Sequence, residues 1–220
     1  MKLTNKKLIF KWMGVFLIVL VSFLVILNFN EGIRSVWEKA STHIFEPEFP
    51  QEYIPLYQEA ANQYGIPWTL LAAHHRVETK FSTMDPLLSS KGAEGHMQFM
   101  PCTFVGWYHP TCTGQGKGEI KKNEKMNPAV IRKYGGYGTD GDGDGIADPY
   151  NLQDALYSAA NYLSDSGASN GELKRAIFNY NQSEEYVEKV LLYFNKYEDE
   201  FRKDYSKESV QKEYTVRCAF

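Results

Sequence analysis

The chain has 220 residues, a formal net charge of −3 and an aromatic content of 15%. That length is sufficient for one sizeable domain with appendages. The small net charge, with no long run of either sign, argues against nucleic acid as the main partner. Three cysteines are too few for a disulfide scaffold and lack the close paired spacing of a zinc site. Outside the cytoplasm, Cys102 and Cys112 could close a short loop and leave Cys218 over; spacing alone leaves a disulfide and free thiols equally open.

The first apolar segment covers residues 8–29, interrupted by only one lysine, one serine and one asparagine. At about 1.5 Å per residue, a helix of this length would span a hydrocarbon core of about 30 Å. Lysines precede or begin the run and favour a cytoplasmic N-terminus: Lys2, Lys6, Lys7 and Lys11. We therefore expect residues 1–29 to be a cytoplasmic tip and a single-pass transmembrane signal anchor, with an extracytoplasmic domain after it. A cleaved signal peptide is the competing interpretation, which the long run and the lack of an A-x-A-like site disfavour.

The rest of the chain is predicted to be mainly helical. Residues 30–50 have the composition of a stalk, and residues 51–205 have that of a folded domain. The polar residues 206–220 are predicted to be a tail, to which we assign no structure. Apolar residues recur at helical spacing, with start and stop signals, in several segments of the domain. These predicted helices cover residues 55–64, 67–80, a stretch from 101, a stretch from 127 to 134, 152–163, 172–179 and a long final helix after Ser183.

The segment 67–81, PWTLLAAHHRVETKF, contains the first candidate for chemistry. Helical spacing places Glu78 on or beside the apolar stripe, where a carboxylate is costly unless it is paired, protonated or used. Burial and the negative end of the helix dipole both raise a carboxyl pKa, which yields a general acid that keeps its proton near neutral pH. The alternative is a helix-end glutamate paired with Arg76 or Lys80 and without a role, and this helix alone favours that alternative.

The segment KGAEGHMQFMP, residues 91–101, combines two glycines with an amide in an apolar run. Gly92 and Gly95 allow the backbone to turn and to approach a neighbour closely. Gln98 needs hydrogen-bond partners among its apolar neighbours, either backbone groups or a polar ligand such as a sugar. A glutamine that holds its own loop is the simpler explanation when the segment is taken alone.

The segment DGDGDGIADPYNLQD, residues 140–154, follows the beginning of an EF-hand calcium loop. Aspartates stand at positions 1, 3, 5 and 9, glycine at position 6, and the position-7 residue would offer its backbone carbonyl. Asn151 replaces the usual glutamate at position 12, and Asp154 is the next carboxylate. The predicted calcium ligands are Asp140, Asp142, Asp144, Ile146, Asp148 and Asp154. Such an ion would hold the loop to the next helix; the alternative is a plain Asp-Gly turn.

In this order the motifs resemble one family, the lytic transglycosylases of bacterial cell walls, and most closely their membrane-bound B-type branch. The blocks that carry the resemblance are RVETKF, SSKGAEGHMQFMP, DGDGDGIADPYNLQDALYSAANYL and AIFNYNQSEEYV, within residues 52–200. The resemblance implies that Glu78 is catalytic. It also implies that a group of residues contacts the saccharide: Ser89, Gln98, Tyr180, Asn181 and Tyr186. Cys102 and the insertion 108–125 depart from the family pattern, and Glu94 occupies a variable position.

The resemblance further implies a mainly α, lysozyme-like fold with two lobes, and peptidoglycan glycan strands as substrate. Glu78 would protonate the oxygen between N-acetylmuramic acid and N-acetylglucosamine and then deprotonate the muramic C6 hydroxyl, giving 1,6-anhydro ends in a lyase reaction. Calcium would be the cofactor, and residues 8–29 would attach the enzyme to the membrane. Alternatives are a muramidase that hydrolyses the same bond, a non-catalytic wall-binding scaffold, and a calcium-regulated binding module resting on residues 140–154 alone.

Overall fold

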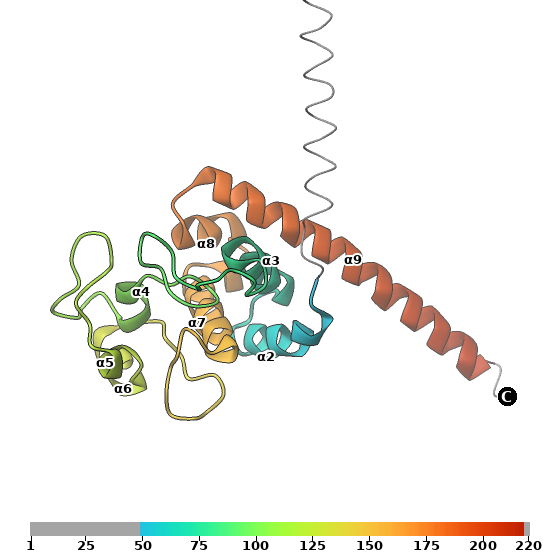
Figure 1. Cartoon of the computed structure of the whole chain (residues 1–220). Helices are drawn as coiled ribbons and strands as arrows, with labels where there is room; N and C mark the ends of the chain where they lie inside the picture. Colours follow the sequence, from blue (N-terminus) through green and yellow to red (C-terminus); the bar gives the residue numbers. More distant parts are fainter. Residues whose placement is uncertain (1–48, 218–220) are drawn as a thin grey trace, which may run out of the picture. The chain divides into compact units, whose positions relative to one another are not determined.

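A computed structural model describes residues 49–217 of the chain, with side chains as far as residue 202. Helices dominate this part, and within it no strand forms, only isolated bridges at Leu88–Glu94 and Glu94–Phe99. The prediction of a mainly helical protein is therefore confirmed (Figure 1). In chain order the elements are η1 (Gln51–Tyr53), α2 (Ile54–Tyr64), α3 (Trp68–Thr79), α4 (Pro101–Val105), α5 (Lys122–Lys125), α6 (Pro128–Tyr134), α7 (Leu152–Asp165), η2 (Ala168–Asn170), α8 (Leu173–Tyr180) and α9 (Glu184–Arg217).

Local signals in the sequence account for where several helices begin and end. A proline in the first turn opens α2, and Gly65 ends it in the left-handed conformation, with φ of 67°. Asn127 caps α6, because its side-chain oxygen accepts the backbone N–H of Ala129 at 2.9 Å. Asn151 caps α7 in the same way, through the N–H of Gln153 at 2.9 Å. The residue predicted at the weak twelfth position of a calcium loop is thus a helix cap.

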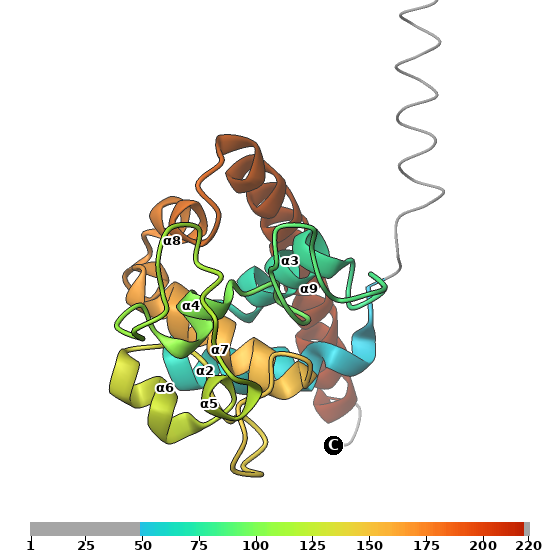
Figure 2. The same ribbon diagram turned by 60° about the vertical axis from the view of Figure 1, so that its left-hand side comes forward.

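The core forms where α3 packs against α9 and where α2 packs against α7 and α3. The short helix α8 contacts both α7 and α9 and closes this group (Figure 2). The buried side chains are mainly apolar, and fully buried large ones include Tyr57, Leu70, Leu71, Leu156, Leu163 and Ile177. This group of helices supplies a rigid base, so that side chains at the end of α3 and the beginning of α9 have fixed positions.

A second group consists of α4, α5 and α6 with their connecting loops, and α4 packs against both of the others (Figure 1). Cys102 in α4 and Cys112 in the following loop form a disulfide, with Cα atoms 5.7 Å apart. Gly106 is required where α4 approaches α6: its φ is 114°, and a Cβ there would lie 2.1 Å from the carbonyl oxygen of Tyr134. These close contacts fix the loop after α4.

The last helix extends farther than the sequence predicted. We assigned no structure to residues 206–220, yet α9 continues from Glu184 to Arg217. No glycine or proline occurs in this range to end it, and the helix formers Glu and Lys are frequent. The first turn carries Glu184 and Glu185, where the helix dipole favours negative charge.

The described part of the chain does not support the predicted single-pass membrane localisation. Among residues 49–217, no helix is both long enough and apolar enough to cross a bilayer. The apolar segment 8–29, which led to the prediction of an anchor, lies outside the described residues, as does most of the predicted stalk. Membrane attachment is therefore not carried further.

Candidate functional site

Glu78 lies in the last turn of α3, where α9 passes it. The hydroxyl of Tyr186, in the first turns of α9, donates to Glu78 Oε1 at 2.5 Å. The same hydroxyl lies 2.9 Å from Nδ1 of His74, one turn earlier in α3. Three side chains from two helices therefore form one hydrogen-bonded row, His74–Tyr186–Glu78.

The surroundings of Glu78 favour its neutral form. Burial raises the pKa of Glu78 to about 7, and the hydrogen bond from Tyr186 opposes that shift. The side chain still keeps part of its surface open to solvent. At neutral pH the carboxyl group therefore exists in comparable amounts with and without its proton, which suits a group that both gives and takes protons.

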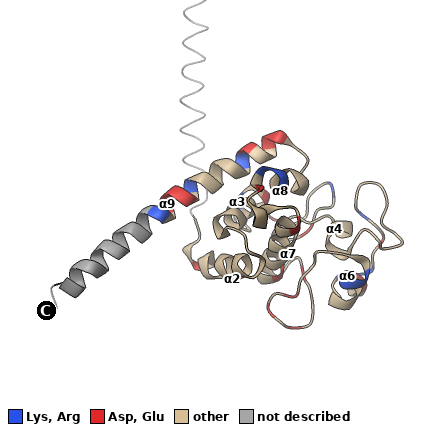
Figure 3. Ribbon diagram, turned by 180° about the vertical axis from the view of Figure 1, so that it is seen from behind, with Lys and Arg blue, Asp and Glu red and all other residues tan. Residues whose placement is uncertain are grey.

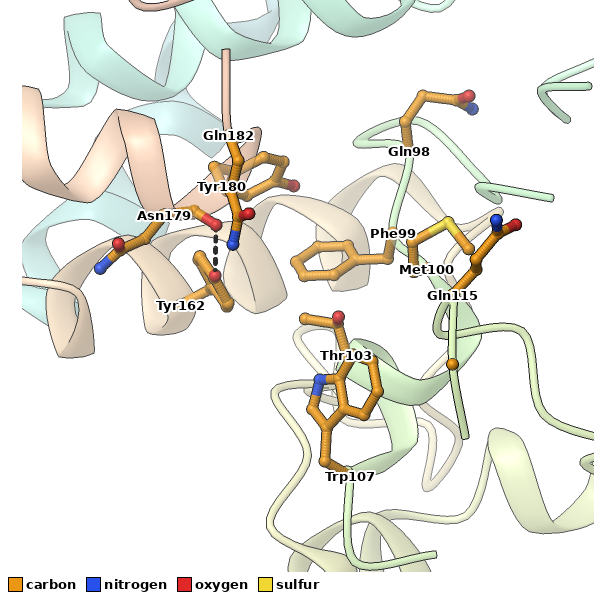
Figure 4. A pocket seen from close by; sticks show the side chains of 11 residues that line it. Gln98, Phe99, Met100, Thr103, Trp107, Gln115, Tyr162, Asn179, Tyr180 and Gln182 are labelled. Carbon is orange, nitrogen blue, oxygen red and sulfur yellow. Dashed lines mark hydrogen bonds between the residues drawn. The ribbon is translucent and has the colours of Figure 1, made fainter. Parts of the chain in front are cut away.

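A groove of about 600 Å³ lies beside this row. Figure 4 shows side chains from the ends of α7 and α8 on one side and from the segments around Phe99 and Trp107 on the other. Tyr162 supports the first side by donating from its hydroxyl to the carbonyl oxygen of Asn179 at 2.8 Å. The lining is aromatic and amide-rich: Gln98, Phe99, Met100, Thr103, Trp107, Gly114, Gln115, Tyr162, Asn179, Tyr180 and Gln182.

Tyr180 connects the groove to the row. Its ring lines the groove and lies 5.0 Å from the His74 ring, centroid to centroid. Burial, and after it the Glu78 carboxylate, raise the pKa of Tyr180, so the two groups are electrostatic neighbours. Glu78 itself does not line the groove. A ligand in the groove would thus meet Tyr180 first and the carboxyl group behind it.

Ser89 and Gln98, which were predicted to contact the saccharide, form hydrogen bonds with backbone groups of their own loop. The Ser89 hydroxyl accepts the N–H of Ala93 at 2.9 Å, and the Gln98 amide donates to the carbonyl of Gly95 at 2.8 Å. Gln98 nevertheless lines the groove, whereas Ser89 does not. Asn181 is exposed at the end of α8 and does not line the groove either. The structure therefore brings together Glu78, Tyr186, Tyr180 and Gln98.

Glu94, the first place to look for a second acid, is engaged elsewhere. Its carboxylate lies 2.5 Å from the ammonium group of Lys125 in a largely buried ion pair. The sequence did not assign Glu94 a catalytic role, and in the structure its carboxylate pairs with Lys125.

The acidic loop before α7 brings three of the six predicted calcium ligands together. Carboxylate oxygens of Asp140, Asp142 and Asp154 lie within 4.8 Å of one another. Figure 3 shows in red the acidic residues along the loop that leads into α7. Asp144 and Asp148 lie outside that group: their carboxylates accept the N–H groups of Ile146 and Tyr150. The Ile146 side chain is exposed, as expected for a residue that would contribute only its carbonyl.

Asp154, in the first turn of α7, is the buried member of this acidic group, with a relative exposure of 1%. It accepts backbone N–H groups from Gly141 at 2.7 Å and from Asp148 at 2.8 Å, and a third from Asp142 at 3.3 Å. Burial raises the pKa of Asp154, and these donors oppose the shift. The carboxylate thus ties both ends of the loop to α7 by itself. Its oxygens and those of two neighbours also form the hard, anionic donor set that calcium prefers.

Several residues of the site had no signal strong enough for sequence reasoning. His74 lies within the predicted helix 67–80 and Trp107 in the stretch that follows residue 101, and neither was singled out. Trp107 is half exposed and Tyr162 partly buried, and both line the groove. Exposure of a large aromatic ring is informative only once neighbouring side chains are known.

Comparisons with known proteins give one relative and no family. The chain is 26% identical over 169 residues to the L-Ala--D-Glu endopeptidase of Bacillus subtilis (strain 168). The match covers 77% of this chain and 47% of that protein, so the chain spans about half the length of the relative. No family model matches, and no solved structure matches.

This comparison corrects the resemblance to lytic transglycosylases. The relative is named as an endopeptidase, an enzyme that cleaves a peptide bond, whereas the predicted lyase would cleave a glycan bond and leave 1,6-anhydro ends. The prediction of a lytic transglycosylase is therefore wrong, and so is that of a muramidase acting on the same glycan bond. Because the relative is named as an enzyme, the comparison also argues against the alternative of a non-catalytic wall-binding scaffold.

The structure gives a physical reason why the motif blocks misled. Gly95 has φ of 77°, and a Cβ there would lie 1.9 Å from the carbonyl oxygen of Pro149. Ser89 and Gln98 hold the same loop through its backbone. These residues meet demands of chain geometry that any protein folded this way would share. The block SSKGAEGHMQFMP therefore indicates the conformation of this loop and does not indicate which bond of a substrate is cleaved.

Proposed function

We propose that this protein is a hydrolase of bacterial peptidoglycan in which Glu78 transfers the proton. The observation that carries the proposal is a partly buried glutamate, Glu78, whose pKa is raised to about 7 by burial and whose carboxyl group is held by Tyr186 beside an aromatic groove. The relative supports the substrate class, because its name describes cleavage between L-alanine and D-glutamate. A peptide bond of the wall is accordingly the target to test first.

In the proposed reaction Glu78 acts first as a general base and then as a general acid. As a carboxylate, Glu78 takes a proton from the water molecule that attacks the scissile carbonyl carbon. As the neutral acid, it returns that proton to the leaving nitrogen when the bond breaks, so one water is consumed and one amine and one carboxyl group are formed. The pKa near 7 suits both steps, and such acid–base catalysis contributes about 10²–10⁴-fold in rate.

The groove supplies position. Its wall from α7 and α8 belongs to the group of helices that forms the core, and its other wall to the α4–α6 group. We propose that these two groups of helices correspond to the two lobes that the sequence predicted. Amide side chains of Gln98, Gln115 and Gln182 offer donors and acceptors that match the amides and hydroxyls of the wall polymer. Trp107 and Tyr162 offer ring faces for its apolar patches.

Calcium is the second part of the proposal. Asp140, Asp142 and Asp154 would hold the ion, and it would neutralise three carboxylates gathered in one place. The ion would act on stability rather than on the reaction, because its ligands belong to the loop that precedes α7 and to the first turn of α7. The carboxylates of Asp144 and Asp148 would have to move to join these three ligands.

The proposed function is tested with the full chain, purified peptidoglycan and two matched variants. Glu78→Gln removes the titrating group, while Glu188→Gln makes the same change on an exposed face of α9. We expect wild type and Glu188→Gln to release new free amino groups, identified by amine labelling and mass spectrometry, and Glu78→Gln to release at least about 100-fold fewer. Absence of new amino groups from wild type, or equal release by Glu78→Gln, would contradict the proposal.

A further inference from the structure

His74 is a buried residue that the proposed reaction does not use directly. Its side chain has no exposed surface, and Nδ1 lies 2.9 Å from the Tyr186 hydroxyl oxygen. Nε2 is buried and, among the described residues, has no hydrogen-bond partner. Burial lowers the pKa of His74 to about 3, so the ring is neutral and carries one N–H at working pH.

Counting hydrogens restricts what this row can do. Tyr186 has one hydroxyl hydrogen, and it donates that hydrogen to Glu78 Oε1. The hydroxyl oxygen must then be the acceptor toward His74, so the N–H of His74 is on Nδ1. The reverse arrangement, in which protonated Glu78 donates to Tyr186 and Tyr186 donates to Nδ1, would place the ring N–H on Nε2, where no acceptor is described.

The two arrangements differ in cost. The first leaves a bare ring nitrogen in the core, and the second leaves a buried N–H without a partner, a group that folded proteins almost always satisfy. Exchange between them also needs a proton to pass from one ring nitrogen to the other. Because Nε2 has no hydrogen-bond partner among the described residues, no hydrogen-bonded chain leads from it through which that exchange could pass.

We propose that His74 is a positioning residue of this site: its Nδ1–H orients the Tyr186 hydroxyl so that the hydroxyl hydrogen points at Glu78 and favours the charged carboxylate. The orienting bond acts across two helices, since His74 and Glu78 are on α3 and Tyr186 is on α9. Without it, the hydroxyl can turn to accept a hydrogen from neutral Glu78. His74 thus limits how far burial shifts Glu78 toward its neutral form.

The other titratable groups around Glu78 do not provide this bias. From α8, Tyr180 faces it with a pKa raised well above the usual value, chiefly by burial, so the ring stays neutral. From α9, Tyr186 is neutral for the same reason. On α3 itself, the guanidinium of Arg76 lies 4.3 Å from the centroid of the Tyr193 ring. The adjacent His75 is bonded through both ring nitrogens, to Tyr57 and Ser82.

The tautomer of His74 can be read in the unaltered protein. In full-length wild type labelled with ¹⁵N-histidine, nitrogen chemical shifts distinguish a protonated from a bare ring nitrogen. We expect His74 to carry its hydrogen on Nδ1 between about pH 5 and pH 9. A hydrogen on Nε2 would overturn the proposal, and this measurement does not depend on any variant folding.

The effect on Glu78 is measured by following its ¹³C-labelled carboxyl group through a pH titration, assigned with Glu78→Gln. His74→Phe removes the donor and keeps an aromatic ring, whereas His74→Asn keeps an N–H donor near the position of Nδ1. We expect the titration midpoint of Glu78 to rise by about one pH unit in His74→Phe and to stay near the wild-type value in His74→Asn. An unchanged midpoint in His74→Phe, or equal rises in both variants, would contradict the inference.

The importance of this inference for catalysis rests on the proposed function, but its test does not. Both magnetic resonance measurements are made without substrate, so they succeed or fail whether or not the protein cleaves peptidoglycan. If wild type does cleave it, the acid limb of the pH–rate profile should move upward with the Glu78 midpoint in His74→Phe and return in His74→Asn. A merely structural role for His74 would lower activity at every pH without moving that limb.

Discussion

Two carboxylates of this protein lie where water is scarce, and they are held in different ways. Asp154 is almost fully buried and accepts N–H groups from three backbone positions. Glu78 keeps part of its surface in solvent, and the bond at its Oε1 comes from a side chain, Tyr186. Burial raises the pKa of both groups.

The difference separates a structural carboxylate from one suited to chemistry. Backbone donors are fixed by the fold, so the Asp154 carboxylate and the loop it holds stabilise each other. Tyr186 donates to Glu78 Oε1, and that oxygen can accept the hydrogen bond whether or not the other carboxyl oxygen carries a proton, so Glu78 can lose or gain its proton without leaving the bond unmade. A carboxyl group that must change its charge during each turnover therefore gains from a side-chain partner.

Replacing Asp154 should have the largest effect on stability. In Asp154→Asn the amide group cannot accept from all three backbone donors, and each buried donor left unsatisfied costs about 1–3 kcal/mol. We expect the free energy of unfolding to fall by about 2–4 kcal/mol in urea titrations with a chelator present. Asp144→Asn, an exposed change in the same loop, should cost less than about 1 kcal/mol. Equal losses would mean that the backbone contacts of Asp154 add nothing.

The pH dependence of stability should distinguish Glu78 from an ordinary carboxylate. Its pKa is raised from 4.5 to about 7 in the folded protein, so the folded state binds more protons than the unfolded state between those values. Wild type should therefore lose stability relative to Glu78→Gln as the pH rises from about 4.5 to 7, by about 1–3 kcal/mol in total. Parallel urea titrations across this range give the difference. A constant difference would show that the Glu78 pKa is unshifted.

Calcium should bind at the site that includes Asp154 and leave Glu78 unaffected. If the ion binds Asp140, Asp142 and Asp154, millimolar calcium should raise the melting temperature over that in chelator, by about 2–4 °C for each kcal/mol of binding energy. Glu78→Gln should respond as wild type does, and Asp142→Asn should respond less. An unchanged melting temperature in wild type would leave the loop as a hydrogen-bonded turn and remove calcium from the proposal.

Much of the helical framework could be predicted because its causes are local. A proline or asparagine at the start of a helix and a glycine at its end act through neighbours a few residues away, as at Asn127 and Gly65. The long extension of α9 was missed because a polar, charged helix has no apolar stripe to reveal it. The motif blocks were read as signs of one reaction, although Gly95 and Ser89 build a loop.

The sequence by itself determined that Glu78 ends an apolar helix, that aspartates crowd before α7, and that Cys102 and Cys112 are close enough along the chain to pair. Only the tertiary structure decided that Tyr186, separated from Glu78 by 108 positions, donates to it, and that His74 stands behind that hydroxyl. The physical reason is the separation along the chain over which each interaction acts. Helix caps and helical periodicity depend on residues a few positions apart. Contacts between α3 and α9 depend instead on how all the helices pack, which cannot be inferred from a short segment of the sequence.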